Sequence, residues 1–360
     1  IAITYQKKNI ISITCFVAIF VVLFVAVSTC VRVTDNITIV NIKGIENEKK
    51  NSLDVALIGA SEVYSGFSPT QAWKNYGYTS YSLGVSGVPG ILYKSMLQKV
   101  LKNQNPSVVV VEINGFMQGD EYMQREGKLH QWLDNIKWDD DRQATINEII
   151  PKDKQKDYVN MFTTYHDNWK NPVKCVKSLY VRSKLSLKTK YDMKGFATIS
   201  GTDANKVYKE KDKKYKLTKK SKAALQDLID YCKDENLKNV IFVRFPHSKE
   251  VKDTKSIEDV KMLVEDNGYD FLDLDSQKRE MNIKTGDDFY NADHLNVYGM
   301  EKLTQYFGDY IRDNYEISKK KPAELTKDWD ESAKRADIMI KKAKKETDLN
   351  TYKRIYELTN

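Results

Sequence analysis

Five short apolar runs constrain the fold of this chain more than any other feature of its sequence. The runs are rich in β-branched, aromatic and other strand-forming residues, most of them are nearly continuous in apolar residues, and stretches of helical or polar character separate them. Such runs are typical of strands that are buried on both faces of a parallel sheet. The expected strands are 55–59, 79–83, 108–113, 240–245 and 271–274. The pattern therefore predicts an α/β fold with a doubly wound, five-stranded parallel sheet.

Helical patterns are expected at 91–102, 220–235, 257–266 and 300–314. Thr218 is the expected N-cap of the second helix, and Asn296, or Tyr298 and Gly299, opens the last. Residues 118–207 separate the third and fourth strands and contain Trp132, Trp138 and Trp169. This segment is too long for an ordinary connection, so we expect a helical insertion that forms a cap over the functional site.

The N-terminal part of the chain contains a candidate membrane span. Residues 10–31 carry no charge, and about 20 apolar residues suffice to cross the hydrocarbon core of a bilayer. Lys7 and Lys8 precede this stretch while Arg32 alone follows closely, which favours a cytoplasmic segment 1–9 and an external remainder. A cleaved signal peptide is the alternative. The stretch is longer than an ordinary signal-peptide core and no clean small-x-small site follows it, so an uncleaved single-pass anchor is favoured.

The rest of the chain is expected to form one large α/β domain over 32–317 and a helix-prone C-terminal tail over 318–360. In the tail, Trp329, Ile338, Ile340, Tyr352 and Tyr356 are the expected apolar contacts. The net charge of +8 arises from lysines scattered among acidic residues, which predicts a solvated charged surface, and no nucleic-acid motif accompanies it.

Only two cysteines lie outside the apolar segment. Cys175 and Cys232 are too few for a disulfide framework or a metal cluster, and whether they form a single bridge stays open.

A serine and a histidine carry the clearest chemical signal. An apolar strand runs into Gly59-Ala60-Ser61, which places the Ser61 hydroxyl at the carboxyl end of a strand, where open α/β sheets carry their reactive groups. His294, far later in the chain, is a candidate base. A lone Gly-x-Ser is more often an ordinary βα turn. Ser61 and His294 therefore indicate a catalytic site only when further sequence blocks accompany them. A serine with a histidine base is suited to acyl transfer through a serine ester.

Four separated blocks occur in the order found in SGNH (GDSL-type) esterases and acyltransferases. The first block contains Gly59, Ser61 and Pro69, and the second, S-L-G-V-S-G, ends at Gly87. The third, V-V-V-E-I-N, ends at Asn114, and the last, N-A-D-H, ends at His294. The chain therefore resembles this superfamily, and the resemblance implies the flavodoxin-like form of the parallel sheet.

The resemblance also implies roles for these residues. Ser61 is the expected nucleophile and His294 its base, and the expected oxyanion hole consists of the Ser61 N–H, the Gly87 N–H and the Asn114 amide. Where the family has an aspartate in D-x-x-H, this chain has Asn291, and Asp293 directly precedes the histidine. We rank three interpretations of this departure in order: a Ser-His-Asn site, a site in which another carboxylate such as Asp293, Asp287 or Asp288 orients His294, and a weakened enzyme.

Within the superfamily, the layout is similar to membrane-anchored bacterial envelope proteins of the DltD type and to polysaccharide O-acetylation proteins. The similar features are the single anchor, the Ser61 block, the long insertion with Y-H-D-N-W at 165–169, the K-G-F segment at 194–196, the D-H-L-N block at 293–296 and the C-terminal tail. The resemblance implies an extracellular serine esterase or O-acyltransferase that acts on teichoic acid or another envelope polymer, with a membrane-bound O-acyltransferase as partner. The alternative is a catalytically silent scaffold that binds such an acyltransferase or a glycan. No cofactor is expected.

The remaining histidines are interpreted as structural. His247 follows the fourth strand and could line the site, but a surface-loop position is favoured. His166 and Trp169 have the i, i+3 spacing of a helix, which favours a structural role, and His130 gives no sharper signal. No two histidines have metal-ligand spacing, so no metal site is expected.

Overall fold

The computed structural model describes residues 2–202, 216–249, 251, 254–318 and 320–358. The chain forms two compact units, one of Ile1–Asn36 with Ile146–Lys188 and one of Ile37–Thr145 with Thr189–Asn360. The expected end of the insertion, residue 207, lies outside the described residues.

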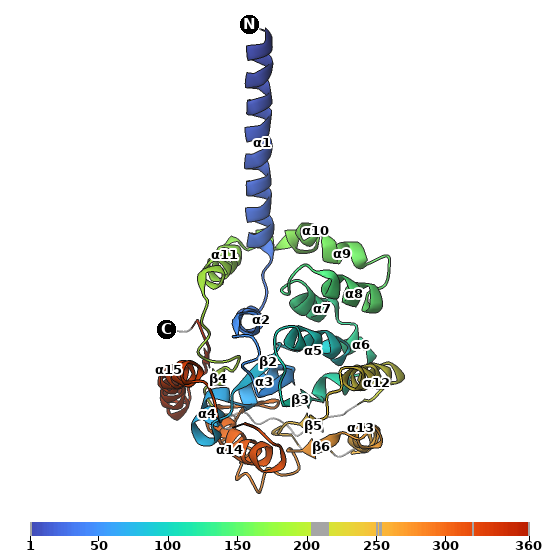
Figure 1. The fold of residues 1–360 in the computed structure, drawn as a ribbon, viewed down its shortest axis with the longest axis vertical. Coiled ribbons are helices and arrows are strands. Elements are labelled where there is room, and N and C mark those ends of the chain that lie inside the picture. The colour runs from blue at the N-terminus through green and yellow to red at the C-terminus, as the bar shows by residue number, and fades with distance from the viewer. Residues whose placement is uncertain (1, 203–215, 250, 252–253, 319, 359–360) are drawn as a thin grey trace. The chain divides into compact units, whose positions relative to one another are not determined.

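A five-stranded parallel sheet forms the centre of the second unit (Figure 1). Its strand order is β2-β1-β3-β5-β6, and every neighbouring pair is parallel. The strands are β1 (Val55–Gly59), β2 (Ser80–Gly84), β3 (Val108–Glu112), β5 (Val240–Arg244) and β6 (Asp270–Asp273). The predicted α/β class and five parallel strands are confirmed, with strand boundaries displaced by at most one residue.

Helices cover both faces of this sheet because both faces are apolar. On one face, alternate residues such as Val55 and Leu57 of β1 pack in a single cluster with Leu303, Phe307 and Ile311 of α14 (Val297–Asn314). Outside this cluster, α5 (Tyr93–Leu101) packs on β1 and α12 (Lys219–Asp234) packs on α5. Figure 1 shows α5 and α14 on opposite sides of the strands.

The helix N-termini follow the capping expectations. The Thr218 hydroxyl accepts the N–H of Ser221 at the start of α12, and the Asn296 side chain accepts the N–H groups of Tyr298 and Gly299 at the start of α14. The second unit contains further helical elements, of which α2 and α8 cross the unit boundary. They are α2 (Asn36–Asn47), α3 (Ser61–Gly66), α4 (Pro69–Tyr76), η1 (Gly90–Leu92), η2 (Asn114–Phe116), α6 (Asp120–Met123), α7 (Glu126–Leu133), α8 (Asp140–Ile149), α13 (Lys255–Asp266) and α15 (Ala323–Asp348).

The C-terminal tail belongs to the second unit. Helix α15 packs on α4 and α14, and β9 (Arg354–Ile355) pairs with β4 (Thr198–Ile199). Trp329 is fully buried beside Trp73, with ring centroids 5.7 Å apart. Ile338, in contrast, is exposed, so the prediction that it makes an apolar contact is wrong: the buried stripe of α15 is completed by small residues such as Ala333 and Ala336.

The first unit contains the apolar N-terminal helix α1 (Ala2–Val31). Among the described residues, its stretch Asn9–Val31 is the one long and apolar enough to cross a membrane. The other helices of this unit are α9 (Gln155–Val159), α10 (Met161–Tyr165), η3 (His166–Lys170) and α11 (Pro172–Leu187). The insertion between β3 and β5 is therefore helical as predicted, but it is divided between the two units, because Ile146–Lys188 associates with α1. Cys175 and Cys232, both within the described residues, are buried and form no disulfide.

Candidate active site

Ser61 lies where the chain leaves the carboxyl end of β1 and begins α3. The sharp turn requires a small residue at Gly59, since a Cβ there would lie 2.6 Å from the Glu112 Cβ and 2.7 Å from a Val63 methyl carbon. Ser61 is the first residue of α3, so its N–H belongs to the turn whose N–H groups have no partner within a helix. The local sequence thus presents both a hydroxyl and an N–H at the edge of the sheet.

His294 reaches Ser61 from the antiparallel pair β7 (Phe289–Asn291) and β8 (His294–Leu295), which directly precedes α14. Its Nε2 lies 2.7 Å from the Ser61 Oγ, and its Nδ1 lies 2.9 Å from the Asn291 Oδ1. The structure therefore places Ser61, His294 and Asn291 in one continuous hydrogen-bonded row, as the sequence predicted for its first-ranked interpretation.

The hydrogen bonds of Asn291 determine the tautomer of His294. The Asn291 Oδ1 accepts the backbone N–H groups of Asp293 and His294, each at 3.0 Å. Because an amide oxygen can only accept, the Nδ1 of His294 must donate to it. In the neutral ring this leaves the Nε2 lone pair directed at the Ser61 hydroxyl, which is the arrangement that a general base requires.

The surroundings of His294 favour the neutral ring. Burial lowers the pKa of His294 below its ordinary value of 6.5, and the nearby carboxylates of Glu62 and Asp293 oppose part of this effect. The side chain nevertheless keeps partial exposure. An unprotonated base is therefore available at neutral pH, together with negative charge that stabilises the imidazolium when it forms.

Asn114 follows the carboxyl end of β3, the strand adjacent to β1, so it lies at the same sheet edge as Ser61. Its amide group donates to the Glu62 carboxylate, and its Oδ1 accepts from the Gln118 amide at 3.1 Å. These two partners fix which end of the Asn114 amide is the nitrogen, and its second N–H is available for another acceptor. In open α/β sheets the gap between these two strands, where the strand order reverses, is the usual ligand site.

Gly87 follows β2 at the same edge. It has a φ of +62°, and a Cβ there would lie 2.8 Å from the Lys128 Nζ. Lys128, in turn, donates to the Ser86 carbonyl at 3.0 Å, and the Ser86 hydroxyl lies 3.2 Å from the Tyr64 hydroxyl of α3. This loop is therefore joined to the helix that carries Ser61, and position 87 favours a residue without a side chain.

Two buried carboxylates complete the site and were missed by sequence reasoning. The Glu62 Oε2 lies 3.3 Å from the Ser61 Oγ, and Glu112 accepts the Asn114 N–H and the Tyr93 hydroxyl. Glu62 is 5% exposed and Glu112 is fully buried. The available signal was Glu112 itself, a charged residue inside an otherwise apolar strand.

The prediction that His247 lies in a surface loop is wrong. This histidine is fully buried, and its Nε2 lies 3.6 Å from the Glu62 Oε1. Its burial follows from its position after the carboxyl end of β5, where its N–H donates to the Asp275 carboxylate at 2.7 Å. His247 therefore belongs to the polar group behind Ser61.

The alternative orienting carboxylates have other positions. Asp293 contributes its backbone N–H to the Asn291 oxygen, and Asp288 is buried in an ion pair with Lys302 at 2.7 Å. Asp287 is exposed. His166 and Trp169 are exposed side chains of the first unit, and His130 is buried beside Asp134 in α7 and its C-cap. The hydrogen-bond partner of the His294 Nδ1 is therefore the Asn291 side chain.

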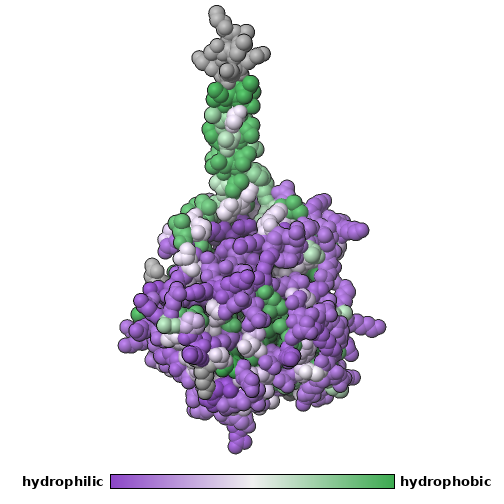
Figure 2. Space-filling view, in the orientation of Figure 1, coloured by the Kyte–Doolittle hydropathy of each residue, from purple (hydrophilic) through white to green (hydrophobic). Residues whose placement is uncertain are grey.

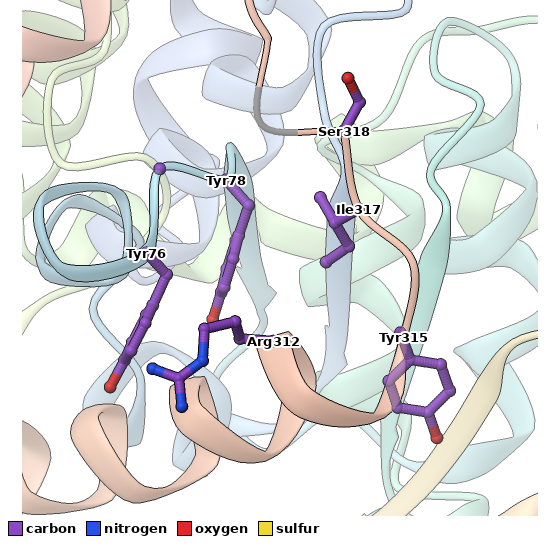
Figure 3. A pocket seen from close by; sticks show the side chains of 7 residues that line it. Tyr76, Tyr78, Arg312, Tyr315, Ile317 and Ser318 are labelled. Atoms are coloured by element: carbon purple, nitrogen blue, oxygen red, sulfur yellow. The ribbon is translucent and has the colours of Figure 1, made fainter.

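A separate pocket lies near the opposite edge of the sheet, before the amino end of β2 (Figure 3). The rings of Tyr76 and Tyr78 stack there with centroids 5.8 Å apart, and the Arg312 guanidinium lies beside them. Arg312 is paired with Asp309 and Asp313, so its charge is already compensated. This pocket has no part in the Ser61 site.

Comparison of the chain with models of protein families gives no match, and comparison with curated proteins gives none either. The functional interpretation therefore depends on the geometry of the site.

Proposed function

We propose that this protein is a serine esterase or O-acyltransferase of the SGNH type, anchored in a membrane by α1. The single observation that carries the proposal is the row Ser61–His294–Asn291, with hydrogen bonds of 2.7 and 2.9 Å and a base in the required tautomer. The strand order β2-β1-β3-β5-β6 supports it, because it matches the flavodoxin-like order expected of the SGNH fold.

The residues present account for each step of acyl transfer. The Ser61 oxygen attacks the acyl carbonyl while its proton passes to the His294 Nε2. The bond to the leaving alcohol then breaks, and His294 returns the proton to the departing oxygen. A hydroxyl of water or of an acceptor attacks the Ser61 ester by the reverse sequence, which restores the serine. The developing oxyanion is stabilised by the N–H groups of Ser61 and Gly87 and by the Asn114 amide.

We further propose that the acceptor or donor is a hydroxyl-bearing polymer of the cell envelope, and that a membrane-bound O-acyltransferase is the partner. The apolar helix α1 supports an anchored location, and the resemblance of the sequence blocks supports this substrate class. In this proposal residues 1–9 lie in the cytoplasm and the second unit lies outside the cell.

A chromogenic aryl acetate tests the function with the full chain in detergent micelles. We expect a rapid release of one equivalent of the phenol per chain, followed by slower turnover as water hydrolyses the acyl-serine. Adding a polyol should raise the steady rate if a hydroxyl acceptor is preferred to water. Absence of any release by the folded chain would favour a silent scaffold that only binds its partner.

Asn291 and Glu62 are expected to act together on His294. Asn291→Asp places a carboxylate beside the Nδ1, so it should raise the pKa of His294 and move the acid limb of kcat/KM to higher pH, while increasing turnover several-fold. Glu62→Gln removes a negative charge that already raises this pKa, so it should move the acid limb lower and reduce turnover. Asn291→Ala should reduce turnover without a comparable shift.

The double variant separates this account from independent effects. Because the carboxylate introduced by Asn291→Asp would supply the charge that Glu62 provides, Glu62→Gln should cost less in the Asn291→Asp background than in the original chain. The measurement is kcat/KM against pH for the original chain, the two single variants and the double variant. Equal losses in both backgrounds, with unmoved acid limbs, would show that Glu62 does not influence the base.

A further inference from the structure

The first unit exposes a row of large apolar side chains along η3 and α11. Trp169, Val173, Val176, Tyr180 and Leu187 are between 59% and 85% exposed. The four in α11 fall within an arc of about 60° at 3.6 residues per turn. The opposite face of α11 is buried through Cys175, Ser178 and Leu185. The helix therefore has an exposed apolar stripe on the side away from its own packing partners.

This stripe lies at the level where the apolar part of α1 ends. Helices α10 and α11 pack on α1, and the rings of Phe162 and Phe24 are 5.5 Å apart. The Asn168 amide donates to the Val31 carbonyl at 2.7 Å, and the Ser178 hydroxyl donates to the Arg32 carbonyl at 2.9 Å. Figure 2 shows hydrophobic atoms beside the end of α1 as well as along it. When α1 crosses a bilayer, residues at this level lie among the headgroups.

The side chains of this surface match that depth. Trp169 and Tyr180 are the residue types enriched at membrane interfaces, where an apolar ring and a polar tip are both accommodated. Lys174, Lys177 and Lys184 are exposed on the same helix. Their ammonium groups can reach anionic headgroups while the aliphatic stems remain beside apolar surface.

We infer that η3 and α11 form a membrane-interface platform, defined by Trp169, Val173, Val176, Tyr180 and Leu187. It lies along the leaflet in which α1 ends, with the stripe at the boundary between headgroups and acyl chains and the lysines at anionic headgroups. The platform and α1 together hold the first unit to the membrane at more than one point, which limits its rotation about the axis of α1. The inference requires α1 to span the bilayer but not the proposed chemistry of Ser61.

Tryptophan quenching in vesicles tests the platform. The full chain is reconstituted in phosphatidylglycerol–phosphatidylcholine vesicles whose acyl chains carry bromine either near the headgroup end or near the methyl end. The stretch 10–31 contains no tryptophan, and Trp73, Trp132 and Trp329 are buried, so quenching reports mainly Trp169 and Trp138. We expect strong quenching by the shallow bromines and weak quenching by the deep ones. The Trp169→Phe variant should lose most of the quenching by shallow bromines, and the matched control Trp138→Phe should keep it.

A charged substitution gives a second test that keeps Trp169 in place. Val176→Glu should reduce quenching, whereas Val159→Glu, at an exposed apolar residue of α9 outside the stripe, should not. Flotation and resistance to alkaline extraction on the same vesicles report whether α1 is inserted, so failure of the span is distinguished from failure of the platform. With α1 inserted, an unquenched Trp169 would overturn the inference and leave the stripe as a surface for a partner protein.

Discussion

Replacing Ser61 by alanine is expected to reduce turnover of an activated ester by about 10⁴-fold or more, and His294→Ala should cause a loss of similar size. The two residues share one hydrogen bond of 2.7 Å and act as a unit, so the double variant should be no worse than either single variant. The measurement is kcat in the aryl acetate assay for the three variants.

Ser65→Ala is the matched control for this loss. Ser65 lies one turn later on α3, and its hydroxyl donates to the Ser61 carbonyl at 2.9 Å rather than to His294. We expect its turnover to stay within a few-fold of the original. If Ser61→Ala and His294→Ala are as active as Ser65→Ala, another nucleophile is responsible.

Asn114→Ala is expected to lower kcat by about 10² to 10³-fold, the cost of one donor in an oxyanion hole, with a much smaller change in KM. The reason is that its amide N–H is needed only when negative charge develops on the acyl oxygen. Phosphonylation of Ser61 should slow by a similar factor, because the phosphonate oxygen occupies the same position.

The control for Asn114 is Gln118→Ala. This change removes the donor to the Asn114 Oδ1 but leaves the amide in place, so we expect a loss of less than about tenfold. Thermal unfolding of both variants reports whether either substitution lowers stability, since Asn114→Ala also removes a hydrogen-bond donor to the Glu62 carboxylate. A kcat for Asn114→Ala within a few-fold of the original would remove Asn114 from the oxyanion hole.

The sheet could be predicted because the local sequence of its strands indicates them. Residues 55–59 and 108–112 are apolar almost throughout, and the same apolar character that defines them also buries them on both faces. The caps Thr218 and Asn296 were equally local. Helix α15 shows the limit of this reasoning: large apolar residues suggested Ile338, but packing selected the face with Trp329, Ser332, Ala333 and Ala336.

The candidate site could be predicted where its residues end recognisable sequence blocks. Ser61 and His294 lie far apart in the sequence but each follows the end of a recognisable block, and Asn291 has the spacing needed to reach the ring. Glu62, by contrast, has a sequence position that is typical of an acidic residue in the first turn of an exposed helix. Its burial depends on contacts with Asn114 and His247, which follow β3 and β5. These residues are distant in the sequence, so no local pattern could indicate the burial of Glu62.

The division of the insertion was also beyond local reasoning. Its helices were predicted, but the sequence did not indicate that Ile146–Lys188 forms a unit with α1. The contacts that decide this, such as Asn168 with Val31 and Ser178 with Arg32, join residues more than 130 positions apart. Sequence periodicity predicts the helices but does not indicate which elements they pack against.

Mass-spectrometric mapping of a fluorophosphonate adduct tests the central claim most directly. The full chain is incubated with the reagent, digested, and the modified residue is identified, with His294→Ala as the comparison. The account predicts one adduct per chain, on Ser61, formed much more slowly in His294→Ala. A folded chain with an unmodified Ser61, or with its adduct on another serine, would contradict it.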